Sequence, residues 1–146
     1  MPVYPGALPG TNWAGEALAA VTLTSFFTRS NVPVKAAQSR FVTWEALREQ
    51  NVILLGHADS NHWIQRVLHS APFSLATTDH LRRARIVNSR PQPGEQAEYF
   101  PTLPEPPKSY ALVSMLAGLD GAHQILVIGQ RIAQGRIHHF DLSQCE

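Results

Sequence analysis

Apolar and polar residues alternate along the chain in blocks that predict helices and strands in turn. From Asn12, a good N-cap residue, apolar side chains recur mainly on one helical face and predict a helix over residues 12–30. The uninterrupted apolar run over 52–55, closed by Gly56, is typical of a strand buried on both faces, as in a parallel sheet. Shorter patterns predict further elements: strands over 32–37 and 73–76, and helices over 44–50 and 61–70.

Prolines and glycines mark the irregular parts of the chain. Three prolines in residues 1–11 exclude a helix and predict an irregular arm, and six prolines in 91–108 predict a loop. Residues 77–90 fit either a helical turn or a strand. Two apolar runs, 110–116 and 124–128, are joined by a short turn with two glycines, which favours an antiparallel hairpin. The tail after Gly129 has no clean period.

The order of these elements predicts an α/β fold, because helices and strands alternate before the late hairpin. We expect residues 1–146 to form a single three-layer domain, since this length fits one domain. Its sheet should be mixed and mostly parallel, with a C-terminal antiparallel hairpin.

The composition and charge of the chain limit the kinds of partner that we expect it to bind. A net charge of +1 gives no broad positive field, so we expect no nucleic acid. Charged residues make up 16%, against the usual value of about 25%, which favours an apolar interface with a second copy or a neighbouring domain. The longest apolar runs are five or six residues, too short to cross a membrane. A single cysteine, Cys145, excludes a disulfide within the chain and favours the cytoplasm.

The turn between the strand at 52–56 and the following helix is the first candidate site. In open α/β sheets, ligands gather at the carboxyl ends of the strands, and helix N–H groups favour anions. We therefore expect Gly56, His57, Ser60 and Asn61 to bind a small anionic ligand. In the alternative interpretation, Ser60 or Asn61 simply caps the helix.

A second candidate for anion binding is an arginine cluster. Arg82, Arg83 and Arg85 carry guanidinium groups suited to carboxylate or phosphate. The same residues would also serve as a solvated charged edge that discourages strand pairing.

Catalysis would use the same turn. His57, Asp59 and His62 have side chains that suit a zinc ion, or a histidine there could act as general base. The stretch partly resembles the His-x-His-x-Asp-His motif of metallo-β-lactamase-like hydrolases, with Asp59 and Asn61 in place of the second His and the Asp. That resemblance implies a small hydrolase for an ester or a lactone. In the leading interpretation no cofactor is expected.

Five short stretches together resemble an uncharacterised α/β module of regulatory and signalling proteins in soil bacteria. They are residues 43–48, 51–56, 60–63, 110–114 and 124–129. The resemblance implies a sensing role and assigns no functional residue. Three functions therefore stay open: a module that binds a small anionic ligand or a partner, a small hydrolase, and a structural dimerisation domain.

Overall fold

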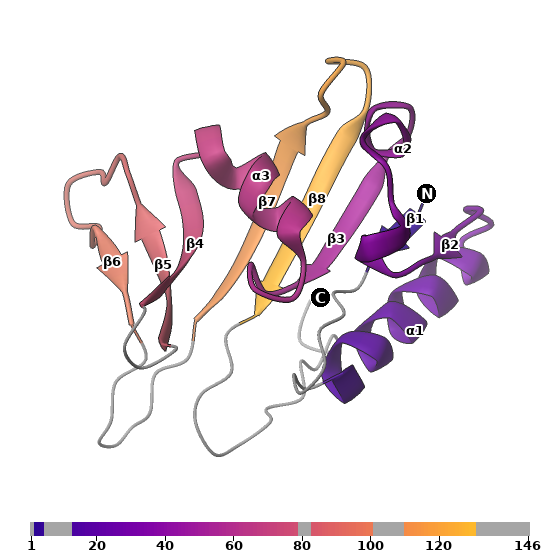
Figure 1. The fold of residues 1–146 in the computed structure, drawn as a ribbon, viewed down its shortest axis with the longest axis horizontal. Helices are drawn as coiled ribbons and strands as arrows, with labels where there is room; N and C mark the ends of the chain where they lie inside the picture. Colours follow the sequence, from indigo (N-terminus) through magenta and orange to yellow (C-terminus); the bar gives the residue numbers. More distant parts are fainter. Residues whose placement is uncertain (1, 5–12, 79–82, 101–109, 131–146) are drawn as a thin grey trace.

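The computed structural model describes residues 2–4, 13–78, 83–100 and 110–130 (Figure 1). Several expectations lie outside the described residues: residues 5–11 of the N-terminal arm, the cap at Asn12, Arg82, residues 101–109 of the proline-rich loop, and the structure of the tail beyond residue 130. The described helices are α1 (Trp13–Arg29), α2 (Trp44–Arg48) and α3 (His62–Val67), with 3-10 turns η1 (Ser39–Phe41) and η2 (Leu68–Ser70). None of these helices is long and apolar enough to cross a membrane.

The larger sheet has five strands and is mixed, as expected. Its order is β2 (Lys35–Ala36), β1 (Pro2–Tyr4), β3 (Val52–Gly56), β8 (Gln124–Gln130) and β7 (Ala111–Ala117). The pairs β1–β2, β1–β3 and β3–β8 are parallel. Strands β7 and β8 pair antiparallel, so the predicted hairpin is confirmed.

Strand β3 lies at the centre of this sheet, and all five of its residues are buried. Its side chains alternate between two apolar clusters, because successive residues of a strand point to opposite faces. Ile53 and Leu55 pack with Val3 and the inner face of α1. Val52 and Leu54 pack on the other face with residues of β8, α3 and the second sheet. Helices α1 and α3 therefore contact opposite faces of the sheet.

The N-terminal arm departs from the expectation, because Pro2–Tyr4 form strand β1. Val3 is fully buried, and its carbonyl accepts a hydrogen bond of 2.9 Å from the Ala37 N–H. The three prolines exclude a helix, but a proline is tolerated at the first residue of a strand. The pairing partners of Val3 are Ala36 and Ile53, both distant in the sequence, so the local pattern did not reveal them.

A second, antiparallel sheet was not predicted. It contains β4 (Phe73–Thr78), β5 (Arg83–Asn88) and β6 (Glu98–Tyr99). The ambiguous segment 77–90 thus includes the whole of β5. Strand β6 falls inside the segment we expected to be a loop, and it pairs with Ile86 and Val87.

Candidate functional site

The turn at residues 56–60 joins β3 to α3 at the carboxyl end of the strand. Gly56 has φ +112, a conformation that side chains other than glycine rarely adopt. The Glu16 carboxylate from the first turn of α1 lies directly against this glycine: a Cβ on Gly56 would come within 2.6 Å of Glu16 Oε1. The turn is therefore covered by a carboxylate of the protein itself, a residue that the sequence analysis did not single out.

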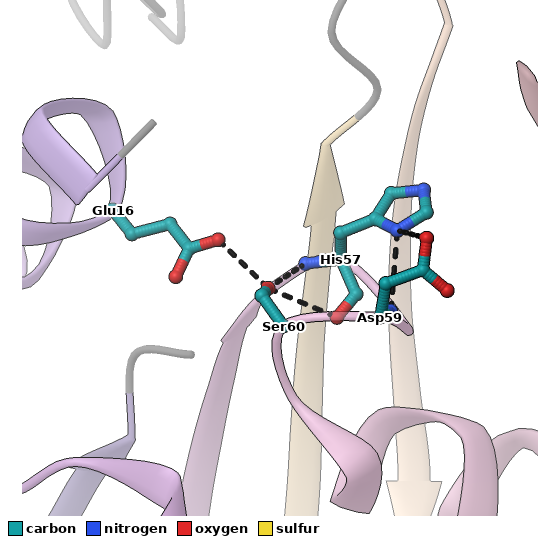
Figure 2. Close-up of polar contacts among 4 residues, drawn as sticks. All are labelled: Glu16, His57, Asp59 and Ser60. Atoms are coloured by element: carbon teal, nitrogen blue, oxygen red, sulfur yellow. Dashed lines mark hydrogen bonds and ion pairs between the residues drawn. The ribbon is translucent and has the colours of Figure 1, made fainter. Parts of the chain in front are cut away.

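Ser60 links this carboxylate to the turn (Figure 2). Its hydroxyl donates to Glu16 Oε1 at 2.9 Å and accepts from the His57 N–H at 3.0 Å, and it also lies 3.1 Å from the His57 carbonyl oxygen. Ser60 is buried, and the N–H groups of Ser60 and Asn61 both donate to the His57 carbonyl. Hydrogen bonds within residues 57–61 therefore hold the backbone of this turn in place.

The His57 ring points toward Asp59 and not toward the Ser60 hydroxyl (Figure 2). Its Nδ1 lies 3.4 Å from Asp59 Oδ2 and accepts from the Asp59 N–H at 3.3 Å. A serine nucleophile needs a base within hydrogen-bond reach of its hydroxyl. Ser60 and His57 do not have this arrangement here, since the Ser60 hydroxyl contacts the main chain of His57 and its ring faces away.

Asn61 acts as the helix cap that the alternative interpretation described. Its Oδ1 accepts from the Trp63 N–H at 3.2 Å, and its Nδ2 donates to the Leu55 carbonyl at 3.1 Å. The side chain is fully buried. Asn61 thus ties the start of α3 to strand β3, and both ends of its amide are engaged within the protein.

The histidine and carboxylate trio considered for zinc is not assembled. Within the described part of the chain, which contains His57, Asp59 and His62, no three His, Cys, Asp or Glu side chains lie together in a way that could hold a metal ion. The His62 side chain is exposed, and its ring lies 4.5 Å from the Trp63 ring. His57 and Asp59 do approach each other, with 3.4 Å between Nδ1 and Oδ2, but His62 does not complete a set of three ligands with them.

The arginine cluster is divided. Arg82 lies outside the described residues, and Arg83 is placed only by its pairing with Thr78 at the end of β5. Arg85 makes an ion pair with Glu98 at 3.5 Å, and its guanidinium lies 6.0 Å from the Phe100 ring. Arg85 is thus engaged within the second sheet and belongs to a different sheet from the 56–60 turn.

An aromatic stack on the α2–α3 surface forms a site that the sequence analysis missed. The rings of Trp44 and Trp63 stack with centroids 5.9 Å apart and an angle of 27° between planes. The Arg66 guanidinium lies 5.0 Å from the Trp44 centroid and 5.7 Å from that of Trp63. The Trp63 indole N–H donates to the Ser39 carbonyl at 3.0 Å, which fixes the stack to η1. We call these three side chains the Trp44–Trp63–Arg66 stack.

A surface depression of about 390 Å³ adjoins this stack. It is lined by Gln65, Arg66, His69 and Ser70, all from α3 and η2. Each of these four side chains can donate a hydrogen bond. The helical spacing of Trp63 and Arg66 was a signal for part of this site, because residues three apart lie on one helix face. The contribution of Trp44 depends on tertiary packing and had no local signal.

Comparisons with known proteins gave no relatives. No family model matches the chain, and no curated protein or solved structure matches it either.

Proposed function

We propose that this chain is a module that binds a small anionic ligand in the depression beside Arg66. The observation that carries the proposal is the position of the Arg66 guanidinium, held over two stacked tryptophan rings at the rim of a depression that Gln65, His69 and Ser70 also line. The resemblance to modules of bacterial regulatory proteins supports a role in such a system.

The stack prepares Arg66 for an oxyanion. A guanidinium that lies on an aromatic face keeps the N–H groups in its own plane directed outward, where they match a carboxylate or a phosphate in bidentate fashion. The stack also lowers the side-chain entropy that Arg66 would otherwise lose on binding. His69 and Ser70 add donors from the next turn.

The charge of Arg66 is not neutralised within the described residues. The one arginine–carboxylate pair within 4.0 Å in that part of the chain is Arg85 with Glu98. The 56–60 turn differs, because the carboxylates of Glu16 and Asp59 already lie at it. This contrast is why we place the proposed anion site at Arg66 and not at the turn.

Titration with citrate and with inorganic phosphate at constant ionic strength, followed by tryptophan fluorescence, tests the proposal. We expect saturable binding that Arg66→Gln weakens by about 10-fold or more, because hydrogen bonds to charged groups contribute about 1.5–3 kcal/mol. Arg66→Lys should give an intermediate loss, since lysine keeps the charge but not the planar fork. Arg48→Gln, on the exposed surface of α2, is the matched control and should bind as the wild type does.

Two results would refute the proposal. One is the absence of saturable binding of either anion up to tens of millimolar. The other is equal affinity in Arg66→Gln and Arg48→Gln, which would mean that binding occurs elsewhere.

The competing proposal is a small hydrolase that acts on an ester or a lactone at the 56–60 turn. The 3.4 Å approach of Asp59 Oδ2 to His57 Nδ1 favours it for the tautomer that carries its proton on Nδ1, because the carboxylate then orients a histidine that acts as general base. Turnover of nitrophenyl esters or of a lactone that His57→Ala abolishes, with the fold retained, would support this function. Absence of turnover would leave the binding module as the proposal.

We also propose that the chain is a single three-layer domain located in the cytosol. The two apolar clusters on opposite faces of β3 support the layers. Limited proteolysis that leaves one protected core containing β3, α1 and α3 would agree with this arrangement, whereas two separately stable fragments would contradict it.

A further inference from the structure

The ring of Trp44 is the part of the Trp44–Trp63–Arg66 stack that is accessible to solvent. Trp44 begins α2 and is 36% exposed, whereas Trp63 is only 5% exposed. Trp63 is also fixed by its indole N–H, which donates to the Ser39 carbonyl at 3.0 Å. Trp44 therefore rests on a buried, anchored ring and presents part of its own surface to solvent.

Trp63 and Arg66 lie on the same face of the Trp44 ring. The Trp44 centroid is 5.9 Å from the Trp63 centroid and 5.0 Å from the Arg66 guanidinium, and that guanidinium is 5.7 Å from the Trp63 centroid. Groups on opposite faces of one ring are separated by two contact distances of about 3.5 Å, roughly 7 Å in all. Since Arg66 and Trp63 are closer than this, neither of them covers the opposite face of Trp44.

A planar aromatic group matches the chemistry of that opposite face. Indole rings stack with a second π system in an offset arrangement. Nucleobases of every kind stack on aromatic side chains in this way, because each base has a π face. The Arg66 guanidinium, the group on which the anion site depends, lies beside the same ring. A ligand that carries both a base and a phosphate would therefore use Trp44 and Arg66 together.

We propose that the anionic ligand of this site is a free nucleotide, whose base stacks on the face of Trp44 opposite Trp63 and whose phosphate pairs with Arg66. This inference rests on the proposed anion site and names the class of its ligand. The surrounding charge favours a single nucleotide over a nucleic-acid strand. Glu45 on α2 and Glu49 at its end are both exposed, and they would oppose a run of phosphates.

Isothermal titration calorimetry with adenosine 5′-monophosphate (AMP) and ribose 5-phosphate tests the proposal. The two ligands share the phosphate and differ in the base. We expect the wild type to bind AMP at least about 5-fold more tightly than ribose 5-phosphate, because one base–aromatic stack contributes a factor of about this size or more. Trp44→Leu should lower the affinity for AMP to that for ribose 5-phosphate, whereas Arg66→Gln should weaken both ligands by a similar factor.

Comparison of the two ligands separates the base from indirect effects on Arg66. Any change that Trp44→Leu causes in the position of Arg66 affects both ligands, so the preference for AMP reports the stacking alone. Trp44→Phe keeps an aromatic face and should retain most of the preference. Phe41→Leu is the matched control, because this ring is 72% exposed and lies 4.8 Å from the Arg40 guanidinium but is not part of the stack. It should bind AMP as the wild type does.

The possible outcomes separate this inference from the anion site itself. Equal affinity of the wild type for AMP and ribose 5-phosphate would overturn the nucleotide and leave the anion site in place. Absence of binding by either ligand would overturn both. A preference for AMP that persists in Trp44→Leu, or that Phe41→Leu removes as fully, would place the base elsewhere and overturn the inference. A short single-stranded oligoadenylate that binds much more tightly than AMP would overturn the free nucleotide in favour of a nucleic acid.

Discussion

The Ser60 hydroxyl donates a hydrogen bond of 2.9 Å to the Glu16 carboxylate across 44 positions of the chain. This contact fixes the first turn of α1 to the turn that follows the central strand β3. It also places a carboxylate directly on Gly56. The position that sequence reasoning favoured for a ligand thus also joins two elements of the fold, and its ligand binding stays a prediction.

Ser60→Ala should destabilise the protein by about 1–3 kcal/mol, because the buried hydroxyl serves both the Glu16 carboxylate and the His57 N–H. Urea denaturation measures the free energy of unfolding. Ser25→Ala, on the exposed side of α1, is the control and should change stability by no more than about 0.5 kcal/mol. Equal stability of the two variants would mean that the contact with Glu16 contributes nothing.

Gly56→Ala should cost about 1–3 kcal/mol, because φ +112 is strained for any residue with a Cβ. The added Cβ also meets Glu16, but that contact involves the end of a flexible side chain. Moving that side chain would also disturb its hydrogen bond with Ser60, so a Glu16→Ala background should relieve this part of the cost and keep the part due to the backbone conformation. Gly15→Ala is the matched control: its Cβ meets nothing within 4 Å, and alanine in a helix should stabilise by about 0.5–1 kcal/mol. If Glu16→Ala restored most of the stability lost in Gly56→Ala, the steric contact with Glu16 and not the backbone conformation would be the main cause of that loss.

The elements that the sequence predicted correctly are those whose signals are local. Strand β3 was recognisable because four consecutive apolar residues and a glycine are typical of a strand buried on both faces, and all five are buried. The cap of α2 is also a local feature, because the Thr43 hydroxyl accepts from an N–H only three residues away. Helix α1 and the β7–β8 hairpin followed from periodicity and from a short turn.

The features that the sequence did not predict depend on contacts between distant residues. Strand β1 needs Ile53 and Ala36 as pairing partners, and a short segment with a proline at its start gives no strand signal by itself. Glu16 reaches Ser60, and Trp44 reaches Trp63, only once the helices pack. Residue type alone suggested that His57, Asp59 and His62 form a cluster, yet His57 contacts Asp59 and the three together do not form a metal site.

Asn61→Ala should destabilise the protein by about 2–4 kcal/mol, because it removes a helix cap and a buried donor to the Leu55 carbonyl together. Asn61→Asp keeps the cap acceptor but replaces the donor with a carboxylate beside that carbonyl, so its loss should be at least as large. Thermal and urea denaturation of both variants measures this. Thr43→Ala, which removes the exposed cap of α2, should cost less, about 0.5–2 kcal/mol. If Asn61→Asp were as stable as the wild type, the bond to Leu55 would be unimportant.

Asp120 in the β7–β8 turn should make stability depend on pH at the acid end. The hydrogen bond from the His123 ring, at 2.7 Å, and those from the N–H groups of Ala122 and His123 lower the pKa of Asp120 from 3.8 to about 2. A carboxyl group whose pKa is lower in the folded state stabilises the fold above its unfolded pKa, and this contribution disappears as the pH falls through the folded pKa. The wild type should therefore be more stable than Asp120→Asn at pH 6, and the difference should shrink between pH 4 and pH 2. Asp59→Asn, which changes another exposed carboxylate in a turn, is the comparison variant. Melting temperatures of the wild type and both variants between pH 6 and pH 2 measure the difference in stability. A difference between wild type and Asp120→Asn that is constant from pH 6 to pH 2 would show that the aspartate stabilises the turn by its shape and not by its charge.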